Sequence, residues 1–167
     1  MKIYIAGPDV FRADAQDHFH YIKKLCEAYG HEALIPTDNE VSEGLEKKEK
    51  GREIFVGNIN MMDQAEVVFA NIEPFRGACM DDGTAFEVGY CYAKEKRIIA
   101  YSTCKDLQLH EVTSQMFDLS KQDKYSEIED FGNCVNLMIS NAIELQGGDI
   151  FTNIEECLYF LNAADVQ

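Results

Sequence analysis

Short apolar runs that alternate with segments of helical spacing constrain the fold of this chain more than any other feature. Residues 2–6, 67–70 and 97–101 are largely apolar along their length, and residues 31–35 form a shorter run that Pro36 ends. Such runs are typical of strands covered on both faces, as in a parallel sheet. The alternation therefore predicts an α/β fold: a doubly wound, flavodoxin-like parallel sheet of about five strands with helices on both faces.

Helices are expected where apolar side chains recur every three or four positions. These segments are residues 12–29, a stretch from about residue 51, and residues 84–95, 133–145 and 150–161. The buried stripe of the helix near residue 84 is expected to consist of Phe86, Gly89, Tyr90 and Ala93. Residues 102–126 show little periodicity and are expected to be irregular. A length of 167 residues suits a single domain over residues 1–167.

Composition excludes several classes of partner. Thirty Asp and Glu residues against fifteen Lys and Arg give a formal charge of −15, which repels phosphate backbones, so we expect no nucleic acid polymer as a partner. No apolar run approaches the ~20 residues of a membrane span, and the first residues lack the features of a secretory signal. The six cysteines are dispersed, as for free thiols in a reducing compartment. We therefore expect a cytoplasmic protein with no membrane partner.

Three loops with polar or turn-forming residues follow predicted strands, at residues 7–9, 36–39 and 72–83. Right-handed crossovers place the carboxyl ends of parallel strands at one edge, where open sheets bind ligands, so these loops are expected to share a site. The chain lacks the glycine-rich loops that bind nucleotide phosphates, the G-x-S-x-G elbow of esterases and any histidine–carboxylate cluster with metal spacing. We therefore expect neither a cofactor nor a metal.

Two carboxylates stand between the third predicted strand and the helix after it. Asp81 precedes the helix, and Glu87 lies about one turn inside it, where unpaired N–H groups and the helix dipole are expected to favour its ionised form. Two carboxyl groups in different environments suit chemistry at a glycosidic carbon, with one attacking and the other protonating the leaving group. The same residues also fit an ordinary turn and helix cap, so this pattern alone leaves both interpretations open.

Several motifs together resemble the nucleoside 2-deoxyribosyltransferase family. They are distributed from residue 3 to about residue 143, and the glutamate segment and the order of the motifs make the resemblance specific. The motifs are residues 4–8 (Tyr-Ile-Ala-Gly-Pro), 57–59, 65–71 and 74–77, Asp81 with residues 83–90, and residues 130–132 and 136–138.

The resemblance implies transfer of 2-deoxyribose between the nucleobases of 2′-deoxynucleosides, with retention at the anomeric carbon. Glu87 would be the nucleophile that forms a deoxyribosyl-enzyme intermediate. Asp81 would bind the base and carry its proton, a contribution typically worth ~10²–10⁴-fold in rate. Tyr4 would hydrogen-bond Glu87 and orient it. Retaining glycosidases hold their two carboxyl groups about 5–5.5 Å apart, and a loop that runs through a glycine from Asp81 to Glu87 permits that approach.

The resemblance assigns further positions. Asn136 resembles the residue that reaches a neighbouring subunit's sugar site, and Met138 is expected to help close the same pocket. A homo-oligomer with shared sites, a dimer or a hexamer, is therefore implied. At the position of Asn58 some members of the family have aspartate. Because an amide cannot donate an acidic proton, this departure shifts the proton transfer towards Asp81 and is expected to alter base preference.

Other substrate-binding candidates come from their place in the expected loops. Phe11, Phe75 and Tyr90 are available to stack on a base or to pack in the core. Phe75 is the stronger candidate for the site because it lies in a loop, whereas Tyr90 is expected to belong to the core. Asp38 follows the second strand and fits either a substrate contact or an ordinary turn. Gly7 and Gly83 complete the set.

Two other functions stay open. A deoxynucleoside 5′-monophosphate N-glycosidase would share the glutamate but must also hold a phosphate, for which Arg12 and Arg76 are the only nearby cations. A non-catalytic nucleotide-binding module would be expected to have lost Glu87 or Asp81, and both are present.

Overall fold

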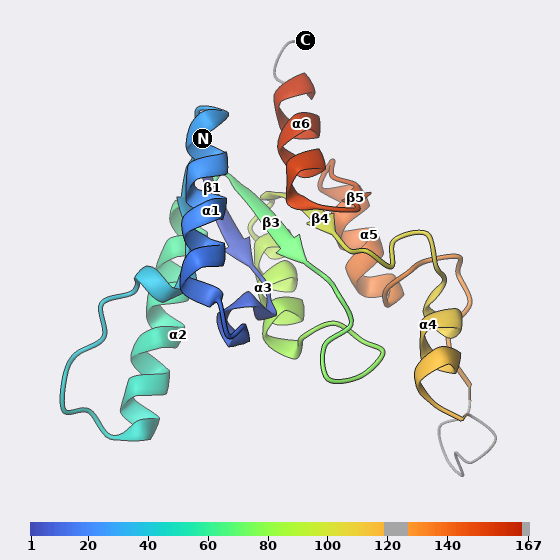
Figure 1. The fold of residues 1–167 in the computed structure, drawn as a ribbon, viewed down its shortest axis with the longest axis horizontal. Coiled ribbons are helices and arrows are strands. Elements are labelled where there is room, and N and C mark those ends of the chain that lie inside the picture. The colour runs from blue at the N-terminus through green and yellow to red at the C-terminus, as the bar shows by residue number, and fades with distance from the viewer. Residues whose placement is uncertain (119–126, 165–167) are drawn as a thin grey trace.

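The computed structural model describes residues 1–118 and 127–164, and it confirms the predicted fold class (Figure 1). Its sheet contains five parallel strands, which are β1 (Lys2–Ala6), β2 (Glu32–Leu34), β3 (Val67–Asn71), β4 (Arg97–Tyr101) and β5 (Ile150–Phe151). The strands lie in the order β2-β1-β3-β4-β5, which is the flavodoxin-like order.

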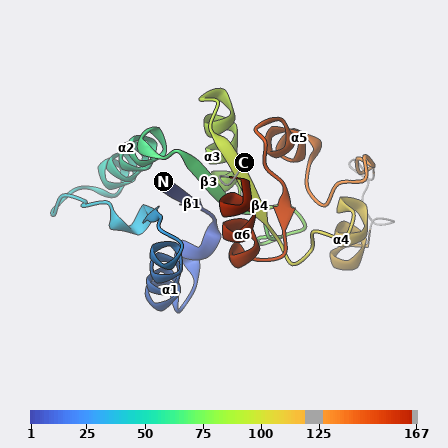
Figure 2. The ribbon, with the colours of Figure 1, turned by 90° about the horizontal axis from the view of Figure 1, so that it is seen from above.

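Helices cover both faces of this sheet. They are α1 (Ala15–Ala28), α2 (Lys47–Gln64), α3 (Asp82–Ala93), α4 (Leu109–Met116), α5 (Leu137–Leu145) and α6 (Ile154–Ala164). Viewed from above, α1 and α6 lie on one face, whereas α2, α3 and α5 lie on the other (Figure 2). Two short 3-10 helices, η1 (Pro8–Phe11) and η2 (Pro36–Asp38), follow β1 and β2.

The alternation of side chains along β1 divides the core into two layers, because successive residues of a strand point to opposite faces. Ile3 and Ile5 pack in the cluster that includes α1 and α6. Tyr4 and Ala6 pack in the cluster that includes α2, α3 and α5. The hydroxyl group of Tyr4 is thereby carried to the α2–α3 side of the sheet.

The order β2-β1-β3 contains a topological switch point. From β1 the chain crosses through α1 to β2, and from β3 it crosses through α3 to β4 on the opposite face. Open α/β sheets bind ligands in the crevice that this reversal leaves at the carboxyl ends of the strands. Both η1 and the loop from β3 to α3 begin at that edge (Figure 1).

Several predicted boundaries were wrong, and helix capping explains two of them. The helix α2 begins at Lys47 rather than near residue 51, because Glu46 and Glu49 form a capping box. The helix α5 begins at Leu137 rather than at residue 133, because Asn136 caps it.

The region predicted to be irregular, residues 102–126, contains α4, whose start is also fixed by a capping box; residues 119–126 lie outside the described part of the chain. Figures 1 and 2 both place α4 beyond the β5 edge of the sheet. Residues 150–151, predicted to begin the last helix, instead pair with β4 as a two-residue edge strand. The last helix therefore starts later, at Ile154.

The predicted buried stripe of α3 was also wrong. The residues that this helix buries are Thr84, Val88 and Cys91, whereas Gly89 is exposed and 51% of Phe86 is exposed. Both sets have helical spacing, so periodicity alone does not choose between them, and the aromatic side chains favoured the wrong face. As a result, α3 presents aromatic rings beside α2 instead of to the sheet.

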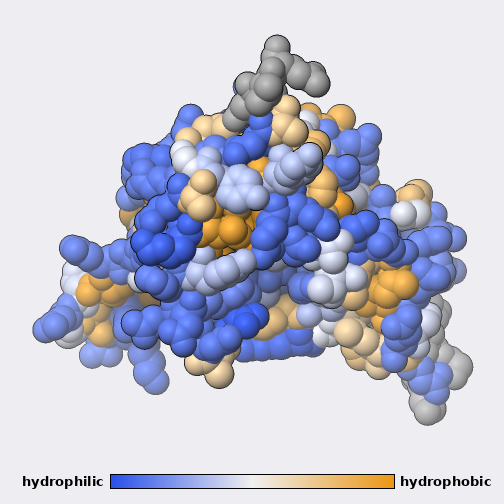
Figure 3. Space-filling model, turned by 45° about the horizontal axis from the view of Figure 1, so that its top comes forward, coloured by the Kyte–Doolittle hydropathy of each residue, from blue (hydrophilic) through white to orange (hydrophobic). Residues whose placement is uncertain are grey.

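The surface is largely hydrophilic, as Figure 3 shows for one face, where hydrophobic patches are small and separate. This agrees with the formal charge of −15. Within the described residues, none of the helices has the length and apolar character needed to cross a membrane. All six cysteines are free thiols. The single domain and the cytoplasmic location stay predictions.

Candidate active site

A hydrogen bond joins β1 to α3 at the switch point. The Tyr4 hydroxyl donates to Glu87 Oε1 at 2.6 Å, and this is the contact that the family resemblance implied. Tyr4 is fully buried, and both burial and the Glu87 carboxyl raise the pKa of Tyr4 far above its ordinary value. The phenol therefore stays protonated and acts only as a donor to Glu87.

Glu87 is half-buried, and its pKa is raised from 4.5 to about 7. Burial is the largest cause; the hydrogen bond from Tyr4 opposes it, and the negative charge of Asp81 adds to it. The expectation that the helix N-terminus would favour the ionised form was therefore wrong. Glu87 is the sixth residue of α3, beyond the first turn to which the free N–H groups and the dipole effect are confined.

Asp81 is the N-cap residue of α3. Its Oδ2 atom accepts hydrogen bonds from the backbone nitrogen of Thr84 at 2.9 Å and from the Thr84 hydroxyl at 3.0 Å. The interpretation of Asp81 as a helix cap is thus correct, but it does not exclude a second role. Its Oδ1 atom has no hydrogen-bond partner among the described residues, and Asp81 is near enough to raise the pKa of Glu87.

A pocket of about 250 Å³ lies between α2 and α3 beside Glu87. Its lining consists of Gly51, Ile54, Phe55, Asn58, Ile59, Met62, Gly83, Phe86 and Glu87. Apolar side chains dominate, with the Asn58 amide and the Glu87 carboxyl as the polar side chains. Ligand sites commonly have this character, and a dry surrounding strengthens electrostatic interactions with a reacting group.

Aromatic rings form the outer wall of this pocket. The rings of Phe55 and Phe86 lie 5.8 Å apart, and those of Phe86 and Tyr90 lie 6.3 Å apart and are stacked. Tyr90, which was predicted to be core, is half-buried and packs against the core cluster that includes Val88 and Cys91, and its hydroxyl donates to Asp63 at 2.9 Å. Sequence reasoning missed Phe55, for which the only signal was an aromatic residue beside Asn58 on the turn of α2 that faces α3.

Other predicted site residues lie outside this pocket. Phe11 and Phe75 stack on each other, with centroids 5.5 Å apart and an interplanar angle of 20°, and the Arg76 guanidinium covers both rings. Asp38 binds Lys23 at 2.7 Å and lines a different pocket, between α1 and η2. Each of the three side chains thus has a partner within the chain, although Phe11 stays 60% exposed.

Gly7 also lies outside the pocket lining. A Cβ atom at Gly7 would come within 2.7 Å of the Asn71 Cβ atom, so this glycine is required for the close approach of the β1 and β3 ends. Its place is explained by packing at the switch point.

Asn136 and Met138 do not reach Glu87 of their own chain. Asn136 Nδ2 donates to Glu129 at 2.6 Å, and its Oδ1 atom caps α5. Met138 is 70% exposed and borders a separate apolar pocket of about 490 Å³ between α3 and α5. Both residues thus lie on the outer surface of the α2–α3–α5 layer.

Neither metal ligands nor cations gather at the site. Over residues 1–118 and 127–164 no group of three or more His, Cys, Asp or Glu side chains could hold a metal ion. The lining of the Glu87 pocket contains no Lys or Arg. Arg12 binds Asp14 at 2.9 Å, and Arg76 lies over the phenylalanine rings.

Comparison with known proteins identifies a family and two similar sequences. The family model described as nucleoside 2-deoxyribosyltransferase matches residues 3–138. An uncharacterized protein of Schizosaccharomyces pombe is 33% identical over 106 residues, which cover 60% of this chain and 49% of that protein, so the chain spans about half the length of this curated relative. A putative 2′-deoxynucleoside 5′-phosphate N-hydrolase of Thermofilum pendens is 24% identical over 154 residues, which cover 87% of this chain and 100% of that protein.

A solved structure gives a more extended match. The 2-desoxiribosyltransferase of Leishmania mexicana superimposes with a TM-score of 0.75 at 31% identity, with 95% of each chain covered. The 2-deoxyribosyltransferase of Bacillus psychrosaccharolyticus shares the fold, with a TM-score of 0.53 at 23% identity over 81% of this chain and 96% of that one. The family-model match and the match to the Leishmania mexicana structure show that the chain belongs to the nucleoside 2-deoxyribosyltransferase family.

Proposed function

We propose that this protein transfers 2-deoxyribose from one nucleobase to another through a covalent bond between the sugar and Glu87. The observation that carries the proposal is the half-buried Glu87 carboxyl, held by Tyr4 at 2.6 Å beside an apolar pocket. A pKa of about 7 makes a substantial fraction of this carboxyl anionic at neutral pH. Burial at the same time leaves the anion poorly solvated and therefore reactive.

Two displacements account for the reaction. In the first, a Glu87 oxygen bonds to C1′ as the bond from C1′ to the base nitrogen breaks; the electron pair leaves with the base, and Asp81 supplies a proton. In the second, an incoming base attacks C1′, the ester bond to Glu87 breaks, and the base returns a proton to Asp81. The two inversions give net retention. The free Oδ1 atom of Asp81 is the proposed site of proton exchange.

A base-exchange assay tests this function. The protein is incubated with a 2′-deoxynucleoside and a different free base, without phosphate or metal, and the products are separated by chromatography. The expected product is the exchanged deoxynucleoside, together with a sugar adduct of Glu87 in mass spectra of protein quenched during turnover. Exclusive hydrolysis, or exchange without any adduct, would overturn the proposal.

One alternative has an observation in its favour. The Thermofilum pendens relative is named as a putative 5′-phosphate N-hydrolase, so hydrolysis of a deoxynucleoside 5′-monophosphate is the second candidate. The absence of Lys and Arg from the lining of the Glu87 pocket supports the transferase instead, because a phosphate dianion needs donors or cations. Comparing kcat/KM for a deoxynucleoside and its 5′-monophosphate distinguishes the two, and the transferase should favour the unphosphorylated substrate.

We also propose that a second copy of the chain completes the site, as the family resemblance implies. Neither Asn136 nor Met138 lines the Glu87 pocket of its own chain. The exposed apolar surface around Met138 supports self-association. A complementation assay tests this. Glu87→Ala and Asn136→Ala proteins, each inactive alone, should regain exchange when subunits are mixed, and the absence of any recovery would contradict shared sites.

A further inference from the structure

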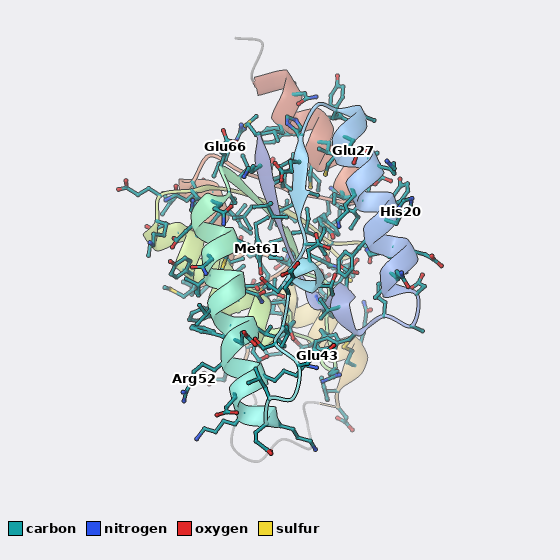
Figure 4. All side chains as sticks on the ribbon, turned by 90° about the vertical axis from the view of Figure 1, so that its left-hand side faces the viewer. His20, Glu27, Glu43, Arg52, Met61 and Glu66 are labelled. Carbon is teal, nitrogen blue, oxygen red and sulfur yellow. The ribbon has the colours of Figure 1, made fainter. Side chains whose placement is uncertain are left out.

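Two amide side chains connect the segment after β2 to the Glu87 pocket. Asn39 directly follows η2, and Asn58 lies on α2 in the pocket lining. The connection that carries Glu43 runs beside the half of α2 that carries Arg52 (Figure 4). Ser42 holds this connection against α2, because its backbone nitrogen and its hydroxyl donate to the Glu53 carboxylate at 2.9 and 2.7 Å.

The orientation of both amides follows from one backbone carbonyl. Asn39 Nδ2 donates to the carbonyl oxygen of Pro36 at 3.0 Å and to Asn58 Oδ1 at 2.7 Å. A carbonyl oxygen can only accept, so the atom of Asn39 that faces Pro36 must be the NH2 group. That group in turn can only donate, so Asn58 must turn its oxygen towards Asn39.

The Asn58 NH2 group is therefore left over as a donor. It has no hydrogen-bond partner among the described residues, and it is not among the side-chain atoms that are buried without one. Asn58 is half-buried and lines the Glu87 pocket, so this donor is available to a ligand bound there.

The Asn39 side chain packs closely against Gly57 of α2. A Cβ atom at Gly57 would lie 2.3 Å from Asn39 Oδ1 and 2.6 Å from its Cγ atom. The Asn39 side chain thus occupies the volume that any larger residue at position 57 would need. Its amide is held by packing as well as by hydrogen bonds, as a group that fixes a neighbour's rotamer should be.

We propose that Asn39 is a positioning residue that makes Asn58 a hydrogen-bond donor to the nucleobase, and so selects bases that present a carbonyl oxygen over those that present an amino group. The proposal rests on the proposed function and deepens it. A donor facing an amino group leaves two donors opposed, and an unpaired polar group of this kind is what sites discriminate against most strongly. The enzyme should therefore favour hypoxanthine over adenine and uracil over cytosine as acceptors.

Asn39→Asp tests the orientation directly. A carboxylate cannot donate to Asn58 Oδ1, but it can accept from Asn58 Nδ2. The substitution should therefore turn Asn58 over and present its oxygen to the base. We expect the ratio of kcat/KM for hypoxanthine to that for adenine to be about tenfold in the unaltered protein, as one lost hydrogen bond implies, and to fall below one in the variant. Retained exchange with an unchanged ratio would overturn the proposal.

Further variants separate positioning from a general loss of structure. Asn39→Ala should bring the ratio close to one, and it keeps the test available if Asn39→Asp fails to fold. In an Asn58→Ala background, changing Asn39 should have no further effect on the ratio, because the group that it orients is gone. Ser42→Ala is the matched control, since it weakens the same connection and should lower the melting temperature without altering the ratio.

A binding measurement separates this inference from the proposed function. If free hypoxanthine stabilises the protein against heat more than adenine does, and Asn39→Asp reverses that order, the inference holds even if no exchange is detected. If exchange is detected but both bases bind alike in the unaltered protein and in the variant, the proposed function stands and the inference fails.

Discussion

Two carboxylates lie at the carboxyl edge of the sheet on opposite faces, and their surroundings differ. Asp9, in η1, is buried, and its Oδ2 atom accepts from the Asn71 amide at 2.8 Å. Its Oδ1 atom lies 3.3 Å from the His18 ring and 3.9 Å from the Arg12 guanidinium. Every oxygen of Asp9 therefore has a polar neighbour.

Glu87 has far fewer partners. The Tyr4 hydroxyl is the single hydrogen-bond donor to its carboxyl among the described residues, and a second carboxylate, Asp81, raises its pKa further. A carboxylate surrounded by donors stabilises a fold, whereas one that is desolvated and only partly satisfied is poised to react. The comparison predicts that the two sites respond to substitution in opposite ways.

The largest expected effects come from removing each carboxylate in turn. Glu87→Ala should lower the exchange rate by at least ~10⁴-fold, as loss of a covalent nucleophile does, while the protein stays folded. Asp9→Ala should instead cost about 1–3 kcal/mol of stability, because it leaves the buried Asn71 amide unpaired, and should change kcat by less than about tenfold. Initial rates and thermal unfolding measure both. Near-normal turnover by Glu87→Ala would remove Glu87 from the mechanism.

The sequence predicted the sheet well for a physical reason. Strands such as residues 67–70 are buried on both faces, so their apolar character is visible without knowing their neighbours. The strand β5 was missed because two residues carry no periodicity, and they were absorbed into the helix that follows. The wrong face of α3 was chosen because Phe86 looks like a core residue in any pattern based on hydropathy.

The site was less accessible to sequence reasoning, because it depends on tertiary contacts. The stacking of Phe11 on Phe75 joins two loops that no local pattern connects, and it uses rings that were candidates for binding the base. The bond from Asn39 to Asn58 likewise joins separate elements. The link between Tyr4 and Glu87 was implied only by the family resemblance, since 83 positions separate the two residues.

Removing the one donor to Glu87 should have the next largest effect and sharpen the contrast with Asp9. Tyr4→Phe keeps the buried ring but deletes the hydroxyl, and kcat/KM should fall by about 10- to 100-fold, the worth of a hydrogen bond to a charged group. Because this hydrogen bond lowers the pKa of Glu87, the pH at which activity rises should also move upward. A variant with lower activity but an unmoved pH profile would show that Tyr4 does not act through Glu87.

The pH dependence of the unaltered enzyme tests the environment of Glu87 itself. The nucleophile must be ionised, so kcat/KM should fall about tenfold per pH unit as the pH drops below its pKa of about 7. Rates measured from pH 5 to pH 9 with a saturating acceptor base give this profile, whose apparent pKa belongs to the coupled pair with Asp81. Full activity at pH 5 would contradict a desolvated Glu87.

The smallest expected effect is on stability, and it follows from the sign of the same shift. The folded state raises the pKa of Glu87 from 4.5 to about 7, so it retains a proton that the unfolded chain releases in this range. The contribution of Glu87 to the free energy of unfolding therefore falls as the pH rises from about 4.5 to about 7 and is then constant. Glu87→Gln keeps the acceptor for Tyr4 but removes the charge, so it should stabilise the protein by about 1–3 kcal/mol at pH 8 and by much less at pH 4. Denaturant unfolding at the two pH values measures this difference.

The matched substitution Asp9→Asn should destabilise the protein at pH 8 instead, because whichever oxygen becomes the NH2 group would face a donor, the Asn71 amide or the Arg12 guanidinium. If both substitutions shift stability in the same direction at that pH, the distinction between the two carboxylates is wrong.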